Sequence, residues 1–285
     1  MRLAAQCGVW RSPLGDTWPH DETVEMDWWP QGTHLVSESP RLVVCASGSG
    51  GGSQQAMFRS HLDPLLRRAH SRWQPGYSPS EPAAAELDRL FATIQRGFEE
   101  LRDPSWADQF QASAVALLIE AKDCAVANVG VDRAWVLRDG QLERVSADYS
   151  LGTMAGGSEP ALPENLRDLP GSFFGRFGGM PARWQVRPVS LCDDVLLVLA
   201  SGFRDTGVSE TRLALELKSV LSVSKEELSC EDAPWQSLGR TAELLGQRLA
   251  EVAAGAEGSD DARMKAKWHL HSRLALAVVQ IAGET

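Results

Sequence analysis

Residues 43–51 read V-V-C-A-S-G-S-G-G and are the most informative stretch of the sequence. An apolar run that passes into closely spaced glycines is typical of a buried strand ending in a tight turn, where the backbone approaches another group closely. The residue at the end of such a strand faces a site, and here that residue is Ser47. A hydroxyl is a poor substitute for a carboxylate as a ligand of a hard cation such as Mg²⁺, which prefers anionic oxygen.

Apolar runs and turn signals on both sides of this stretch predict strands interspersed with helices. We expect strands at 3–9, 33–37, 112–120, 124–131, 133–138, 141–145, 194–200 and 274–281, the first two as edge strands. The dipeptide Asp139-Gly140 predicts a hairpin turn between two of them. Helices are expected at 54–73, 81–102, 211–223 and 235–254.

The clearest predicted helix covers residues 81–102. Ser80 is expected to cap it, and Pro82 falls in the first turn, where its missing amide hydrogen costs little. Apolar side chains at helical spacing predict one face that packs against a core. They are Leu87, Leu90, Phe91, Ile94, Phe98 and Leu101.

A flap-like surface excursion is predicted around 152–180, where Gly, Pro and Ser are frequent. Three phenylalanines in it, and four tryptophans nearer the N-terminus, suit either the core or a protein interface, because aromatic residues are enriched in interface hot spots. They are Phe173, Phe174, Phe177, Trp10, Trp18, Trp28 and Trp29.

Composition predicts one domain over residues 1–285, with 43% hydrophobic residues available for a core. The net charge of −10 argues against nucleic acid or an anionic membrane as a partner. The five cysteines are odd in number and lack metal-site spacing, which indicates reduced thiols in a cytoplasmic protein. No apolar stretch approaches the roughly 20 residues that cross a bilayer.

Five short segments carry further motifs, in this order along the chain: R-S-P-L-G-D at 11–16, C-A-S-G-S-G-G at 45–51, N-V-G-V-D-R-A at 128–134 with D-Y-S at 148–150, L-V-L-A-S-G-F-R-D at 197–205, and H-S-R-L at 271–274. Together they resemble the motif segments of the metal-dependent Ser/Thr phosphatases of the protein phosphatase 2C (PPM) type. Those segments read R-x-x-N-E-D, V-x-D-G-x-G-G, N-V-G-D-S-R-A with D-H-S, L-L-x-S-D-G-x-x-D and D-N-x-T.

The resemblance implies an α+β fold in which two antiparallel sheets pack as a central sandwich flanked by helices on both sides. It also places the family's metal-site and phosphate-site positions on this chain. The metal-site positions are Gly15, Asp16, Ser47, Gly48, Ser201, Asp205 and His271, and Arg11 is the phosphate-binding candidate. At most of them the expected carboxylate is missing, as it is at Val131 after Gly130. Asp260 and Asp261 lie far upstream of the last strand, so we do not expect them to replace the final carboxylate.

The missing carboxylates carry a consequence for catalysis. In the family, two metals activate a water molecule and neutralise the phosphate during in-line attack. Concentrating two divalent cations in a pocket without anionic ligands is strongly unfavourable. We therefore predict a pseudophosphatase without metal, cofactor or catalytic residues, which acts as a regulatory module and binds a protein partner.

Two alternatives remain open. Arg11 could grip a phosphorylated Ser or Thr of a partner protein through paired charged hydrogen bonds, without hydrolysis. Alternatively, Ser47, Ser201, His271 and Asp16 converge in the implied fold and could form a rebuilt site with a nucleophile and a base.

Overall fold

The strands of the computed structural model form two five-stranded sheets in which all pairings are antiparallel. The structure describes residues 3–11, 34–35, 42–49, 64, 82–100, 111–120, 123–154, 171–175, 182–190, 195–201, 203, 207–227, 234–255 and 275–283. Sheet I has the order β1 (Leu3–Arg11), β10 (Ala275–Gly283), β9 (Val195–Ser201), β6 (Arg133–Arg138), β7 (Gln141–Arg144). Sheet II has the order β2 (His34–Leu35), β3 (Leu42–Ser49), β4 (Gln111–Ile119), β5 (Cys124–Val129), β8 (Trp184–Val189).

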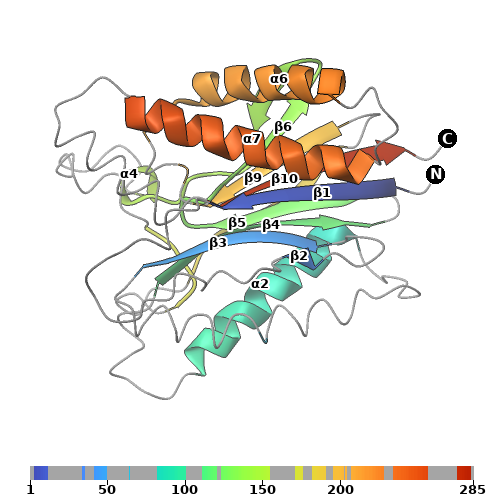
Figure 1. The fold of residues 1–285 in the computed structure, drawn as a ribbon. Coiled ribbons are helices and arrows are strands. Elements are labelled where there is room, and N and C mark those ends of the chain that lie inside the picture. The colour runs from blue at the N-terminus through green and yellow to red at the C-terminus, as the bar shows by residue number, and fades with distance from the viewer. Residues whose placement is uncertain are drawn as a thin grey trace.

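Helices cover the outer faces of both sheets, so the molecule has four layers (Figure 1). Helix α2 (Ala83–Glu99) packs on sheet II, and α6 (Glu210–Glu227) and α7 (Pro234–Gly255) lie over sheet I. A one-turn helix, α4 (Leu151–Met154), follows the β6–β7 hairpin. The architecture confirms the predicted α+β class with two antiparallel sheets between helices.

The long apolar runs follow from burial on both faces of the central strands. In β4, for example, Ala114, Ala116 and Leu118 pack toward α2, whereas Val115, Leu117 and Ile119 pack between the two sheets. A third core lies under α6 and α7. No helix in the described part of the chain has both the length and the apolar character needed to span a membrane.

Helix α2 confirms the predicted apolar face, with Leu87, Phe91, Ile94 and Phe98 among its buried residues. Its predicted cap was wrong. The helix begins at Ala83, and the Ala83 N–H donates to Asp123 Oδ2 at 2.8 Å. Because Asp123 is 40 positions away in sequence, local spacing could not identify this cap.

The predicted hairpin turn is confirmed. Asp139 and Gly140 both have positive φ, 49° and 72°, and they join the paired residues Arg138 and Gln141. Two central residues with positive φ match the twist of the flanking strands, which is why this dipeptide favours tight hairpins.

Two regions differ from expectation. Strand β8 was not predicted, because it carries Pro188 and partly exposed side chains that break the apolar pattern, as an edge strand allows.

Within the predicted excursion, residues 171–175 are buried. Phe174 belongs to the core, with its ring centroid 5.0 Å from that of Phe91, and Phe173 is buried too. The helix predicted at 54–73, apart from Pro64, and the residues Phe177, Trp18, Trp28 and Trp29 lie outside the described residues.

Candidate functional site

Four of the motif segments reach one end of the sandwich with their described residues. We call this end the rim and define it by Arg11, Ser47, Asp132 and Ser201. In sheet I, Arg11 and Ser201 both pair with Ala275, so they lie at the same level on either side of β10. Arg133 pairs with Ala200, and continuing that register by one residue places Asp132 opposite Ser201. The rim of sheet I therefore brings the predicted phosphate-binding residue and a predicted metal-site position to one level.

In sheet II, the residue at the rim end of β3 is Ser47, which pairs with Ser113 on β4. Its neighbour Gly48 pairs with Ala112. The sheets meet here because residues 130–132 link β5 of sheet II directly to β6 of sheet I. Deeper between the sheets, the Cys45 thiol lies 3.9 Å from the Leu199 carbonyl oxygen, two residues before Ser47 and Ser201 in their strands.

The link between the sheets is packed tightly against Ser113. Gly130 has a φ of 81°, and a Cβ atom there would lie 2.1 Å from Ser113 Oγ. The Ser113 hydroxyl accepts a hydrogen bond from the Val131 N–H at 3.4 Å. Ser113 was not singled out from the sequence, where it reads only as the polar residue that precedes an apolar run.

Asp132 is a second residue that the sequence interpretation passed over. The expected acidic position after Gly130 is occupied by Val131, but the next residue is an aspartate whose exposure is 0%. Continuing the β6–β9 register by one residue beyond the Arg133–Ala200 pair puts this carboxylate opposite Ser201. Within the described residues, no group of three or more His, Cys, Asp or Glu side chains is arranged to hold a metal ion.

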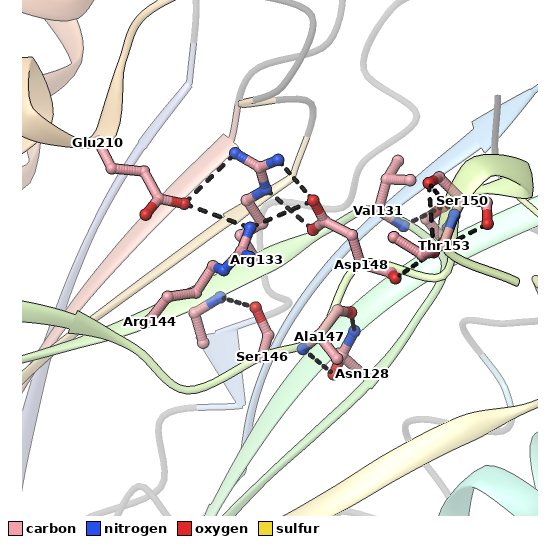
Figure 2. Close-up of polar contacts among 12 residues, drawn as sticks. Asn128, Val131, Arg133, Arg144, Ser146, Ala147, Asp148, Ser150, Thr153 and Glu210 are labelled. Atoms are coloured by element: carbon pink, nitrogen blue, oxygen red, sulfur yellow. Dashed lines mark hydrogen bonds and ion pairs between the residues drawn. The ribbon is translucent and has the colours of Figure 1, made fainter. Parts of the chain in front are cut away.

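A charged network borders the rim. Arg133 donates to both oxygens of Asp148, from Nε to Oδ1 at 3.0 Å and from Nη2 to Oδ2 at 2.6 Å. Arg144 also reaches Asp148 Oδ2, at 3.2 Å, and both arginines lie within 3.5 Å of Glu210 Oε1 (Figure 2). The network ties the β6–β7 hairpin to the residues after it and to the start of α6.

The segment after the hairpin is fixed by amide and hydroxyl contacts as well (Figure 2). The Asn128 side-chain amide donates to the Ala147 carbonyl and accepts from the Ala147 N–H. Ser150 caps α4, because its hydroxyl accepts from the Thr153 N–H at 3.3 Å while Thr153 Oγ1 accepts from the Ser150 N–H at 2.9 Å. The D-Y-S motif therefore has a structural role beside the rim.

The predicted site residues fall into two groups. Backbone register places Arg11, Ser47, Gly48 and Ser201 at the rim. The remaining predicted positions lie outside the described residues, and their convergence stays a prediction. They are Gly15, Asp16, Asp205, His271, Asp260 and Asp261.

Similar solved structures share this fold over nearly the whole chain. The Mycobacterium tuberculosis serine/threonine phosphatase PstP/Ppp has 14% sequence identity and a TM-score of 0.62, with 99% of this chain and 100% of that chain covered. The PstP catalytic domain in complex with two manganese ions gives 14% identity, a TM-score of 0.59 and coverage of 99% of both chains. PppA, described as a key regulatory component of T6SS in Pseudomonas aeruginosa, gives 14% identity, a TM-score of 0.59 and coverage of 98% of both chains.

No family model and no curated protein matches the sequence. The likeness to solved structures therefore concerns architecture alone. The chain has the fold of the PPM-type Ser/Thr phosphatases.

Proposed function

We propose that this chain is a pseudophosphatase, a PPM-type fold that binds a protein partner and regulates it without hydrolysing phosphoesters. The observation that carries the proposal is the donor set at the rim. Ser47 and Ser201 stand where the family motifs have carboxylates. Ser47 pairs with Ser113, and the β6–β9 register, continued by one residue, puts Asp132 opposite Ser201 as the one carboxylate at this level among the described residues.

This donor set does not fit a pair of hard divalent cations. Serine hydroxyls are neutral, and Mg²⁺ or Mn²⁺ sites need several anionic oxygens to offset dehydration of the ions and their mutual repulsion. Among the described rim residues, Asp132 is the one carboxylate, so these residues contribute at most one negative charge. Water activation by two metals therefore has no support from the described rim residues.

Metal titration with a parallel activity assay tests the proposal. Calorimetry with Mn²⁺ and with Mg²⁺ should detect no tight site in the wild-type chain, and hydrolysis of a phosphoserine peptide should equal the buffer blank. The double variant Ser47→Asp/Ser201→Asp restores two carboxylates and should bind Mn²⁺ more tightly than the wild type. Tight binding of two ions with turnover by the wild type would refute the proposal.

The regulatory part of the proposal concerns a protein partner in the cytoplasm. Cys45 and Cys124 are buried and form no disulfide within the described part of the chain, which suits a reducing compartment. PppA offers a precedent for a protein of this fold with a regulatory role. In native extracts, the chain should elute above its own mass of 31.0 kDa together with a second, different polypeptide. Elution of the chain alone would contradict this part.

A second candidate function is recognition of phosphoserine or phosphothreonine by Arg11. The observation that favours it is the position of Arg11 at the same rim level as Ser201. A guanidinium group can hold a phosphate through two parallel hydrogen bonds. Arg11→Ala should then abolish binding of a phosphopeptide, and an unchanged affinity would eliminate this candidate.

A further inference from the structure

Two arginines place exposed positive charges on one face of the edge strand β8. Side chains alternate along a strand, so Arg187 and Arg183, which directly precedes β8, share a face. Trp184 and Val186 pack toward α2 from the opposite face. On that opposite face, Trp184 Nε1 donates to Asp88 Oδ1 at 2.8 Å, so this acidic residue is turned away from the two arginines.

These two arginines differ from most others in the described part of the chain. Ion pairs with carboxylates neutralise six arginines there, namely Arg89, Arg133, Arg144, Arg212, Arg240 and Arg248. Among the same residues, the guanidinium groups of Arg183 and Arg187 have neither an ion pair nor a hydrogen bond.

Ser172 holds Tyr149 next to Arg183. The Tyr149 carbonyl accepts from the Ser172 N–H at 3.2 Å, and the Ser172 hydroxyl donates to the Arg183 carbonyl at 2.9 Å while accepting from the Arg183 N–H. The Gly171 N–H also donates to the Tyr149 carbonyl, at 2.6 Å. Two backbone segments that are distant in sequence are therefore fixed side by side, with Tyr149 and Arg183 separated by one buried serine.

The positive charges of Arg187 and Arg183 both affect the pKa of the Tyr149 phenol. Burial raises the pKa of Tyr149, and Arg187 and then Arg183 lower it. The net direction is upward, so at neutral pH the phenol stays protonated and can donate a hydrogen bond. The two positive charges thus oppose the effect of burial on the pKa of this hydroxyl.

We propose that Arg183, Arg187 and the Tyr149 hydroxyl form a binding site for a phosphate group, distinct from Arg11 at the rim. All three groups present donors and none presents a negative charge, which suits an anion with several acceptor oxygens. Guanidinium groups match phosphate geometry through paired hydrogen bonds. Because Trp184 pairs with Val129, Arg183 lies at the level of Gly130, at the same end of the sandwich as the rim.

Binding measurements without metal test this site independently of the proposed lack of catalysis. Calorimetry in EDTA buffer would titrate the chain with a phosphoserine peptide, its unphosphorylated form and inorganic phosphate. Arg183→Gln/Arg187→Gln should weaken phosphopeptide binding by at least about tenfold, because two charged donors are lost. Arg96→Gln, an exposed change on α2, is the matched control for loss of charge and should bind as the wild type does.

Further variants separate this site from the rim and from a folding defect. Tyr149→Phe should weaken binding severalfold, and Arg187→Lys, which keeps the charge but loses the planar fork, should give an intermediate affinity. Arg11→Gln distinguishes the two sites: if Arg11 at the rim holds the phosphate instead, this variant loses binding and the double variant keeps it. Loss of binding only in Arg11→Gln, equal binding by the double variant, or no phosphate binding by the wild type would each overturn the inference.

Comparing the affinities for the phosphoserine peptide and for inorganic phosphate identifies the source of the ligand. A phosphopeptide that binds at least about tenfold more tightly than inorganic phosphate indicates a phosphorylated protein segment, because flanking residues then add contacts. Equal affinities indicate a small free phosphate compound. Both results support the site, and salt should weaken both, because the arginines are exposed.

Discussion

Gly130 and Ser113 approach so closely that a Cβ atom at position 130 would lie 2.1 Å from Ser113 Oγ and 2.7 Å from Ser113 Cβ. Through this contact, residues 130–132, which link the two sheets, pack against β4 at Ser113, the residue that pairs with Ser47. The rim geometry therefore depends on an absent side chain at one position and a small polar side chain at the other.

Gly130→Ala should destabilise the protein by about 3 kcal/mol or more, since it adds an overlap with Ser113 to the strain of a positive φ. Urea unfolding measures the free energy of unfolding. Gly140→Ala is the matched control, because Gly140 also has a positive φ but a Cβ atom added there would meet no other atom within 4 Å; its loss should be about 1 kcal/mol. Equal losses in both variants would show that the contact with Ser113 does not matter.

Asp148→Asn should lower the free energy of unfolding by about 2 kcal/mol at low salt. Asp148 and Arg133 are only 13% and 14% exposed, so removing the carboxylate charge leaves a largely buried guanidinium short of its partner. Urea unfolding at low and high salt measures the effect.

Glu243→Gln provides the control for this ion pair. Glu243 pairs with Arg240 at 45% and 47% exposure, and such exposed pairs contribute little. The Glu243 change should alter the free energy of unfolding by less than about 0.5 kcal/mol. An Asp148 variant that is no less stable than the Glu243 variant would contradict a structural role for the network.

Local patterns predicted the elements whose cause is local. The apolar face of α2 follows from helical spacing, and the Asp139-Gly140 turn follows from two residues that tolerate positive φ. Strand β8 could not be predicted in this way. An edge strand does not need a continuous apolar pattern, and Pro188 is a residue that argues against a strand in a sequence.

The site could be predicted only as far as the motif resemblance reached. It pointed to Ser47 and Ser201, and the backbone register brings both to the rim, while their role as metal-site positions stays a prediction. Local spacing does not reveal that Ser113 packs on Gly130 or that Asp132 lies opposite Ser201, because those contacts depend on strand pairing between distant segments. The same holds for the pairing of Arg133 with Asp148.

Cys124 should be inert to alkylating reagents in the native protein at pH 8. Burial, and then the nearby charge of Asp123, raise the pKa of the Cys124 thiol to about 12, so almost no reactive thiolate is present. Mass spectrometry after iodoacetamide treatment, with and without denaturant, measures the modification. Rapid native labelling at position 124 would contradict its burial.

The same pKa shift makes stability depend on alkaline pH. The native thiol keeps its proton when the unfolded thiol has lost it, so its contribution is fully present below the unfolded pKa and is lost as pH rises through about 9 to 12. Cys124→Ala removes this group. Between pH 9 and 11 the wild type should therefore lose stability more steeply than Cys124→Ala, and parallel curves would count against the shift.

Asp123→Ala should cost about 1 kcal/mol of stability, because the Ala83 N–H at the start of α2 then loses its acceptor at 2.8 Å. Asp123→Asn tests whether the hydrogen bond or the charge matters. An amide oxygen can still accept from Ala83, so this variant should lose less than about 0.5 kcal/mol, as caps with Asn and Asp are nearly equivalent. If both variants lose the same amount in urea unfolding, the carboxylate acts through its charge near the helix N-terminus, and the cap is electrostatic rather than a specific hydrogen bond.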